Sequence, residues 1–323
     1  MLIRKPQFYD TFHCIASRCP DSCCQKWDVS VDDEKAAFYR SIPGPLGERL
    51  REFLVEEDGV TYLSLDGTRC PMWREDGLCR IQAELGEGAL CKTCREFPRL
   101  THEYDGFTEL GLELSCPEAA GIILGESSWQ WVESGRPEET DPDMALLLRT
   151  RQRAMALTEE EQPLQKLFFY GLYVQDLLDG EEETCFSTEN LPTVENDGDM
   201  EAFLKVFRDL EILTPEWAER LRHPDPRPLG KEDRAMLRYL ISRYWLQAVS
   251  DLDLICRVKF MIAAVLLVCI LGGDPTETAQ AFSKEIENDA DNVDALLDGA
   301  YSLPGLTDRN LLGLMESCAI AHR

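Results

Sequence analysis

The stretch Cys14-Ile-Ala-Ser-Arg-Cys19-Pro-Asp-Ser-Cys23-Cys24 opens a run of thiols that decides how the first part of this chain folds. Nine of the thirteen cysteines lie between Cys14 and Cys116, whereas the rest of the 323-residue chain holds only four. The nine are Cys14, Cys19, Cys23, Cys24, Cys70, Cys79, Cys91, Cys94 and Cys116. Cysteines that merely filled a core would not gather in one region. We therefore predict that this region is built around a thiolate site.

Metal ligation, disulfide bonds and inert burial are the three possible uses of these thiols. No apolar signal segment follows Met1, so we expect a cytoplasmic, reducing environment in which disulfides are rare. An odd number of cysteines would also leave one thiol without a disulfide partner. Thiolates bind zinc, cuprous copper and iron–sulfur clusters well. We therefore predict that the nine cysteines are metal ligands.

The spacing of the cysteines bears on which metal they bind. Cys91 and Cys94 are separated by two residues, a gap that both zinc ribbons and iron–sulfur proteins use. Neighbouring side chains on an extended backbone point apart, so the pair Cys23-Cys24 could serve two metals or two irons of one cluster. Nine candidates also exceed the four ligands of a tetrahedral zinc. The sequence favours a cluster or two sites, with zinc as the alternative.

Four further polar residues near the cysteines are weaker candidates. Arg95 and Arg99 could bind cluster sulfurs or an anionic ligand, but ordinary ion pairs with acidic neighbours are the simpler expectation. His13 and His102 lie near cysteines without the repeated spacing of metal ligands. We do not include them in the predicted ligand set.

Composition and charge narrow the classes of partner. A hydrophobic content of 44% and a charged content of 29% are typical of a soluble globular protein. The net charge of −27 would repel phosphate backbones, so we expect no nucleic-acid partner. The acidic surface aids solubility, and it would also attract a basic protein substrate. The apolar run Phe260–Leu271 is too short to span a bilayer, so we predict a central buried helix and no membrane association.

The periodicity of apolar residues changes near residue 117. Before it, short strands are predicted at Phe8–Cys14, Trp27–Val31, Thr61–Leu65 and Phe107–Leu114, among short helices such as Glu34–Arg40 and Ile81–Leu85. After it, helices are predicted at Ala119–Trp131, Asp141–Leu157, Thr158–Leu178, Glu201–Leu210, Thr214–Leu221, Glu232–Val249, Asp253–Leu271, Asp274–Asn288 and Arg309–Ala321. The fold class is therefore mainly α (α+β). We predict a cysteine-rich metal-binding module at 1–124 and an all-helical bundle at 125–323.

Four motifs together resemble the flagellin lysine N-methylase family. They are the opening stretch Cys14 to Cys24, Cys70-Pro-Met-Trp-Arg-Glu-Asp-Gly-Leu-Cys79, Cys91-Lys-Thr-Cys94-Arg-Glu-Phe-Pro98, and Leu-Ser-Cys116-Pro. The resemblance covers roughly residues 8–124. It implies a bacterial methyltransferase that moves a methyl group from S-adenosylmethionine to the ε-amine of lysines in flagellin or another lysine-bearing protein. It also implies an iron–sulfur cluster, of which 4Fe–4S is the expected type.

The sequence departs from two common methyltransferase patterns. It has no acidic Gly-x-Gly-x-Gly turn of the Rossmann type, and Cys19-x3-Cys23-Cys24 lacks the Cys-x3-Cys-x2-Cys spacing of radical S-adenosylmethionine enzymes. A deprotonated amine is itself nucleophilic, so polar displacement on the sulfonium is open to this chain. No catalytic residue or donor pocket can be identified from the sequence. The alternative function is a non-catalytic zinc- or iron-binding interaction protein.

Overall fold

The computed structural model describes residues 1–136, 140–189, 191–192 and 198–320, which form two compact units. We call them the helical unit (Met1–Asp10, Thr101–Ser115 and Ala120–Arg323) and the cysteine unit (Thr11–Leu100 and Cys116–Ala119). A compact unit need not be a domain that folds independently. The predicted domains 1–124 and 125–323 therefore stay a prediction. The chain enters and leaves the cysteine unit twice.

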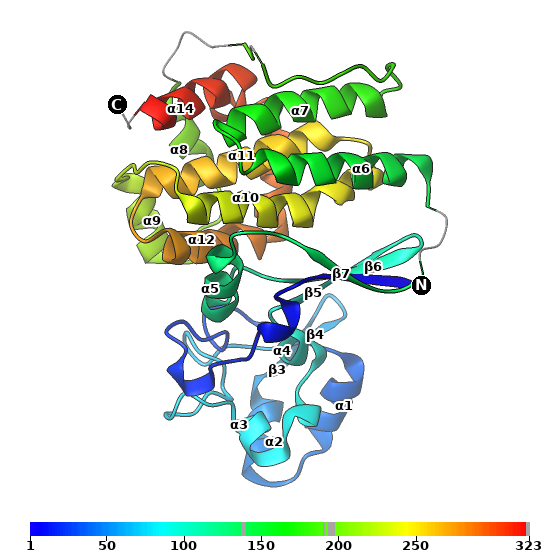
Figure 1. Cartoon of the computed structure of the whole chain (residues 1–323). Coiled ribbons are helices and arrows are strands. Elements are labelled where there is room, and N and C mark those ends of the chain that lie inside the picture. Colours follow the sequence, from blue (N-terminus) through cyan, green and yellow to red (C-terminus); the bar gives the residue numbers. More distant parts are fainter. Residues whose placement is uncertain (137–139, 190, 193–197, 321–323) are drawn as a thin grey trace. The chain divides into compact units, whose positions relative to one another are not determined.

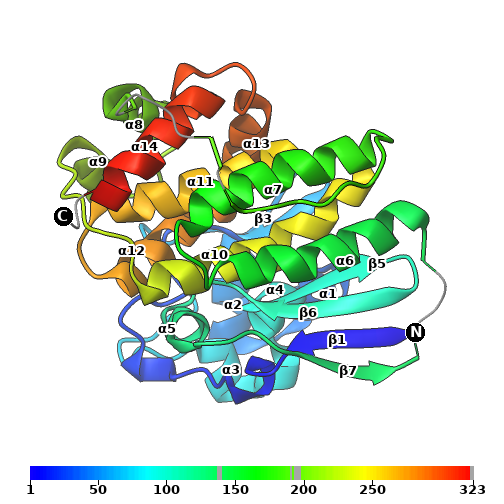
Figure 2. The same cartoon turned by 45° about the horizontal axis from the view of Figure 1, so that its top comes forward.

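A four-stranded sheet belongs to the part of the chain that also carries the long helices. Its strand order is β5 (Arg99–Tyr104), β6 (Phe107–Leu112), β1 (Leu2–Pro6) and β7 (Trp131–Gly135). Strand β1 runs parallel to β6 and antiparallel to β7, as Figures 1 and 2 show. Strands β5 and β6 are joined by Asp105-Gly106, where Gly106 has a φ of 89°, the left-handed conformation that tight hairpin turns need. The predicted strand at Phe107 is confirmed.

Two predictions about this sheet are wrong. The first strand is Leu2–Pro6 rather than Phe8–Cys14, and residues Tyr9–Thr11 form a 3-10 turn instead. Helix α5 (Pro117–Gly125) ends before Trp131, which begins strand β7. Backbone pairing of β7 with β1 along its whole length replaces the expected helical bonds, so 125–323 is not all-helical.

Helix α11 (Leu254–Leu271) is the centre of the helical unit. It packs against α7 (Pro163–Leu178), α10 (Lys231–Tyr244) and the later helices, which Figure 1 shows around it. By length and composition it could cross a membrane, but every residue of it is buried inside the protein. The prediction of a central buried helix is therefore confirmed. The other helices here are α6 (Pro142–Leu157), α8 (Met200–Arg208), α9 (Pro215–Arg222), α12 (Pro275–Phe282), α13 (Ala290–Gly299) and α14 (Asp308–Ile320).

Local capping explains where most of these helices begin. Asp141 accepts a hydrogen bond from the Asp143 amide at 2.8 Å and precedes Pro142 at the first helical position of α6, as the sequence predicted. Thr158 was predicted to cap the next helix, but α7 begins at Pro163 with Gln162 before it. The Thr158 hydroxyl instead donates to the Met155 carbonyl at the end of α6.

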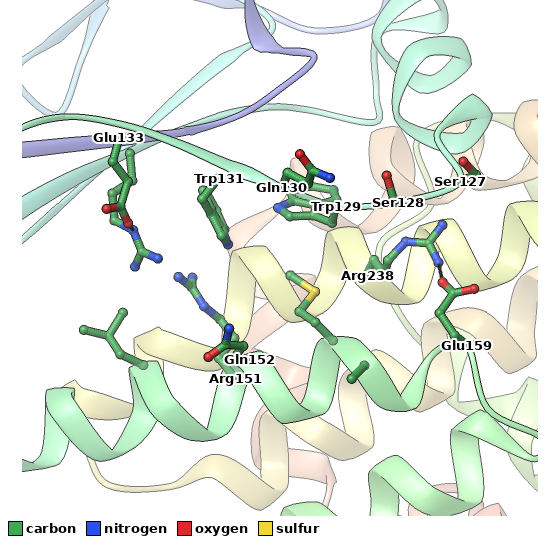
Figure 3. A pocket seen from close by; sticks show the side chains of 14 residues that line it. Ser127, Ser128, Trp129, Gln130, Trp131, Glu133, Arg151, Gln152, Glu159 and Arg238 are labelled. Carbon is green, nitrogen blue, oxygen red and sulfur yellow. Dashed lines mark hydrogen bonds and ion pairs between the residues drawn. The ribbon is translucent and has the colours of Figure 1, made fainter.

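A cavity of about 570 Å³ lies within the helical unit. Figure 3 shows that one wall is the segment from Ser127 to Glu133 and the facing wall is helix α6. All the residues that line it belong to this unit.

The cysteine unit combines a small sheet with short helices. Its sheet has the order β2 (Val29–Val31), β4 (Val60–Leu63) and β3 (Leu54–Glu57), with both pairs antiparallel. Its helices are α1 (Asp33–Ser41), α2 (Gly44–Phe53), α3 (Arg80–Leu85) and α4 (Lys92–Glu96). The predicted strands near Val29 and Thr61 and the helix that ends at Gly86 are confirmed.

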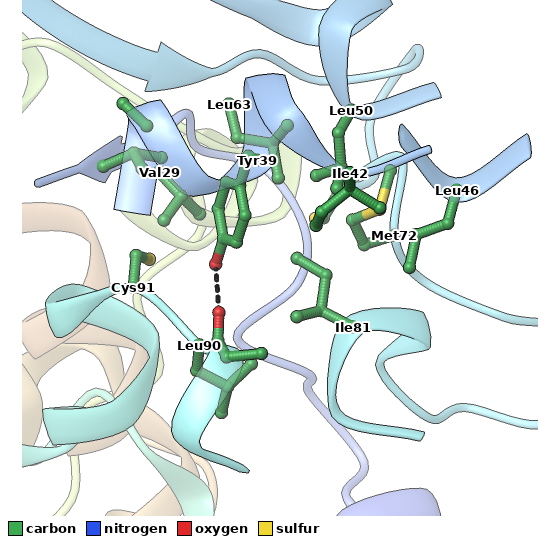
Figure 4. Packing of buried hydrophobic residues seen from close by; sticks show 14 residues of the cluster. Val29, Tyr39, Ile42, Leu46, Leu50, Leu63, Met72, Ile81, Leu90 and Cys91 are labelled. Atoms are coloured by element: carbon green, nitrogen blue, oxygen red, sulfur yellow. Dashed lines mark hydrogen bonds between the residues drawn. The ribbon is translucent and has the colours of Figure 1, made fainter. Parts of the chain in front are cut away.

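Apolar side chains from these short elements form one core, shown in Figure 4. Tyr39, Leu50 and Met72 are almost fully buried in it. The Tyr39 hydroxyl donates a hydrogen bond to the Ala89 carbonyl at 2.8 Å, which satisfies the polar end of a buried ring. Because Cys91 lies in the same core, the packing that stabilises this unit also positions a thiol.

Candidate functional site

All nine predicted cysteine ligands belong to the cysteine unit. Eight lie within Thr11–Leu100, and Cys116 joins them because the short segment Cys116–Ala119 returns to this unit. Of the other cysteines, Cys256 and Cys269 are buried in helix α11, which confirms their predicted place in the core. The side chain of Cys318 lies outside the described residues. The tertiary fold therefore gathers the thiols that the sequence analysis singled out.

Five of these thiols influence one another electrostatically, and we call them the core thiols; four pack in or against the core of the unit, whereas Cys94 is exposed. They are Cys24, Cys70, Cys79, Cys91 and Cys94. Cys70 and Cys91 are buried in the hydrophobic cluster, and Cys24 and Cys79 pack against it. The Cys70 amide donates to the Cys24 carbonyl at 2.8 Å, which ties the first cysteine loop to the second.

The electrostatics of the core thiols favour thiolate at two positions. The hydrogen bond with Cys23 lowers the pKa of Cys24 to about 7, and the hydrogen bond with Cys94 lowers the pKa of Cys91 to about 7. Burial raises the pKa of Cys70 to about 12, and the nearby charge of Cys24 adds to this rise. Near neutral pH, Cys24 and Cys91 are thus each partly ionised. The thiolate is the form that binds metals.

The other four thiols form a second neighbourhood, which we call the outer thiols. They are Cys14, Cys19, Cys23 and Cys116. The hydrogen bond with Cys24 raises the pKa of Cys23, and the charges of Cys14 and Cys116 act in the same direction. Burial raises the pKa of Cys116 to about 11, and its thiol neighbours are Cys19 and Cys14. Because Cys23 is hydrogen-bonded to Cys24, this pair joins the outer thiols to the core thiols.

The junction between strand β2 and helix α1 holds the loop that carries Cys91 and Cys94. One Asp32 carboxylate oxygen accepts the Lys35 amide at 3.1 Å and caps α1, and the other accepts the Lys92 amide at 2.8 Å. The Thr93 hydroxyl donates to the Ser30 carbonyl at 3.0 Å. Two residues of the Cys91–Cys94 turn are therefore fixed by a segment about sixty positions earlier in the chain.

Gly77 allows the segment Cys14–Cys19 and the loop between Cys70 and Cys79 to pack closely. Gly77 has a φ of 80°, as expected for the predicted Asp76-Gly77 turn. A Cβ atom at Gly77 would lie 3.3 Å from the Cα of Ser17, so the backbones are close at this point. The segment Cys14–Cys19 is thereby held against the loop between Cys70 and Cys79.

The arginines and histidines that lie near the cysteines in the sequence either contact groups other than the thiols or lie elsewhere in the structure. Arg95 pairs with Glu96 at 3.7 Å, as the simpler expectation had it, and the guanidinium of Arg99 lies 5.2 Å from the ring centre of Phe12. His13 is exposed. His102 belongs to strand β5 in the helical unit, where burial lowers its pKa.

Within the described parts of the chain, no three Cys, His, Asp or Glu side chains are arranged so that they could hold a metal ion. The chemistry of the donors nevertheless suits a thiophilic metal, because soft thiolates are concentrated in one small unit. The ligand set of nine cysteines and the identity of the metal both stay predictions.

The sequence analysis missed a buried polar cluster in the helical unit. Glu287 accepts hydrogen bonds from Tyr239 at 3.2 Å and Tyr244 at 2.9 Å, and Arg243 lies 3.3 Å from the same carboxylate. Burial raises the pKa values of both tyrosines. Charged residues on helices usually face solvent, so nothing in the local sequence marks these as buried.

Comparison with known proteins gives three curated relatives. The flagellar biosynthetic protein FliU of Salmonella muenchen is 30% identical over 136 residues, which cover 38% of this chain and 78% of FliU. A Lysine-N-methylase of Salmonella typhimurium and one of Salmonella choleraesuis are each 31% identical over 131 residues. These cover 38% of this chain, which spans only 33% of the length of each methylase. No protein-family model and no solved structure matches. With most of FliU covered at this identity, the chain belongs to the flagellin lysine N-methylase family.

Proposed function

We propose that this chain transfers methyl groups from S-adenosylmethionine to the ε-amines of lysines in flagellin, in the bacterial cytoplasm, and that its cysteine unit holds an iron–sulfur cluster. Membership of the family supports the reaction, and the names of two relatives specify lysine N-methylation. The observation that carries the proposal is that all nine clustered thiols belong to one compact unit. The net charge of −27 suits a lysine-bearing protein substrate.

The reaction needs a neutral lysine amine. A free lysine has a pKa of ~10.4, so roughly one amine in two thousand is neutral at pH 7. The amine nitrogen attacks the methyl carbon, the carbon–sulfur bond breaks, S-adenosylhomocysteine leaves, and the new amine loses a proton. The protein must therefore align the two substrates and favour loss of the first amine proton, either by burial or with a base.

The thiols would hold the cluster through four of their number, with 4Fe–4S as the expected type and zinc as the alternative. The core thiols suit this role best, because two of them already favour the thiolate. A bound cluster would crosslink the loops of this unit. The outer thiols would then not be ligands of this cluster.

The test is methyl transfer by the anaerobically purified full chain. Methyl-labelled S-adenosylmethionine and flagellin should give label on flagellin lysines, and flagellin whose amines have been chemically blocked should take up none. The Cys79→Ser variant should lose cluster and activity, whereas Cys185→Ser, an exposed thiol outside the nine, should keep both. Binding of flagellin with no transfer of label would instead support a non-catalytic metal-binding interaction protein.

A further inference from the structure

The cavity of the helical unit has the size of a small-molecule site. Its volume of about 570 Å³ lies within the range of ~300–1,000 Å³ that is usual for bound cofactors and drug-sized ligands. The extended segment before β7 and the facing side of α6 form its walls, as Figure 3 shows. No residue that lines it belongs to the cysteine unit.

Two indole rings provide an aromatic wall. Trp129 and Trp131 lie with their ring centres 5.9 Å apart and their planes at 63°. Phe8 packs edge-on against Trp129 at 5.0 Å, which supports this ring from behind. The Nε1 donor of Trp129 is buried and has no hydrogen-bond partner in the described structure. Because this nitrogen is inaccessible, Trp129 offers the cavity the face of its ring rather than a hydrogen-bond donor.

Charged residues line the rest of the cavity in nearly balanced numbers. Arg151 is buried and held by Glu109 at 2.6 Å, so its charge is already neutralised. Arg4 pairs with Glu133 at 2.9 Å, and Arg238 pairs with Glu159. The side chains of Glu133 and Glu159 are 50% and 59% exposed. These two glutamates can therefore turn into solvent and leave their arginines to a ligand carboxylate.

This chemistry fits some ligands of the proposed reaction better than others. Each of the three guanidinium groups has a carboxylate partner, so the cavity suits a ligand that carries charges of both signs. A flat heteroaromatic base can stack on an indole, and an amino-acid carboxylate can replace glutamate on an arginine. Ser128 and Gln152 add neutral hydrogen-bonding groups for sugar hydroxyls.

We infer that this cavity binds S-adenosylmethionine, with adenine against Trp129 and the methionine carboxylate on Arg238, an inference that rests on the proposed function. The class of ligand is a nucleoside with a zwitterionic amino-acid tail. The product S-adenosylhomocysteine has the same two ends and is stable, so it is the probe for binding.

The test uses a matched pair of variants in which an exposed helical alanine is replaced by leucine. Ala156 of α6 lines this cavity, and Ala295 of α13 lines a different cavity in the same unit. Leucine is a good helix former, so Ala156→Leu and Ala295→Leu should both fold while each fills its own cavity. Calorimetric titration of the full chain with S-adenosylhomocysteine should give at least tenfold weaker binding for Ala156→Leu and unchanged binding for Ala295→Leu. Trp129→Leu, which removes the aromatic ring but keeps an apolar side chain, should weaken binding several-fold.

The outcomes separate this site from the proposed function. If Ala156→Leu binds S-adenosylhomocysteine as wild type does, or if ATP binds more tightly than S-adenosylhomocysteine, the assignment of the cavity is overturned. If the wild type transfers methyl groups and Ala156→Leu keeps its KM for S-adenosylmethionine, the reaction stands and the site lies elsewhere. Binding that is lost in Ala156→Leu, from a wild type that does not methylate flagellin, supports the site and refutes the reaction.

Discussion

Replacing Asp32 by Ala should loosen the turn that carries Cys91 and Cys94 as well as the start of helix α1. The two carboxylate oxygens of Asp32 accept separate backbone amides, from Lys35 in its own helix and from Lys92 in the thiol turn. Loss of the N-cap costs about 1 kcal/mol. Loss of a charged hydrogen bond costs about 1.5–3 kcal/mol, at the low end here because Lys92 is exposed to water. We expect Asp32→Ala to lower the free energy of unfolding by roughly 2–3 kcal/mol.

Asp274 provides the matched control. It accepts the amides of Thr276 and Glu277, both at 3.0 Å and both within its own helix α12. Asp274→Ala should therefore cost about 1 kcal/mol and leave the thiols unchanged. Urea unfolding gives the free energies, and alkylation of metal-free protein followed by mass spectrometry gives the rates at Cys91 and Cys94. Faster alkylation in Asp32→Ala alone is expected. Equal destabilisation of the two variants with unchanged alkylation would refute the reasoning.

The same contacts make the effect depend on pH. Burial raises the pKa of Asp32, but the amides of Lys92 and Lys35 lower it by more, so the pKa lies below its ordinary value of 3.8. A lowered carboxyl pKa stabilises the folded protein above the ordinary value and ceases to do so as the pH falls through the lowered one. The difference between wild type and Asp32→Ala should therefore be full at neutral pH and shrink below about pH 4.

Three further predictions concern the metal, the buried charges and the substrate. Anaerobic protein should be brown, with iron and sulfide in comparable amounts, and Cys94→Ser should bleach it; stoichiometric zinc in colourless protein would contradict the cluster. Arg151→Met leaves the buried Glu109 carboxylate with only Arg4, so urea unfolding should show a loss of about 3 kcal/mol, against less than about 1 kcal/mol for Arg149→Met, whose pair with Glu183 is exposed. Higher ionic strength should raise the KM for flagellin more than it lowers kcat, because salt screens the acidic surface; activity that is insensitive to salt would show that recognition is local to the target lysine.

Helix starts, helix ends and turns depend on residues that are close together in the sequence, so they were predictable from it. The expected helices Glu34–Arg40, Ile81–Leu85 and Asp141–Leu157 are all present, because caps such as Asp32 and Asp141 and the glycine stop at Gly86 each require a particular residue type at one position. The buried helix α11 was marked by its apolar run. In contrast, strand β7 and helix α13 were missed because pairing and packing with distant segments, rather than local pattern, stabilise them.

The sequence by itself determined that the thiols of Cys14 to Cys116 form a distinct chemical region and that a helical body follows. Only the tertiary structure decided how those thiols are grouped, with Cys24 tied to Cys70 by a backbone hydrogen bond and Cys23 hydrogen-bonded to Cys24. It alone also placed β1 and β7 side by side and enclosed the tryptophan-lined cavity with α6. The physical reason is that spacing along the chain limits which residues can meet, whereas closure of long loops and burial of apolar surface select the ones that do.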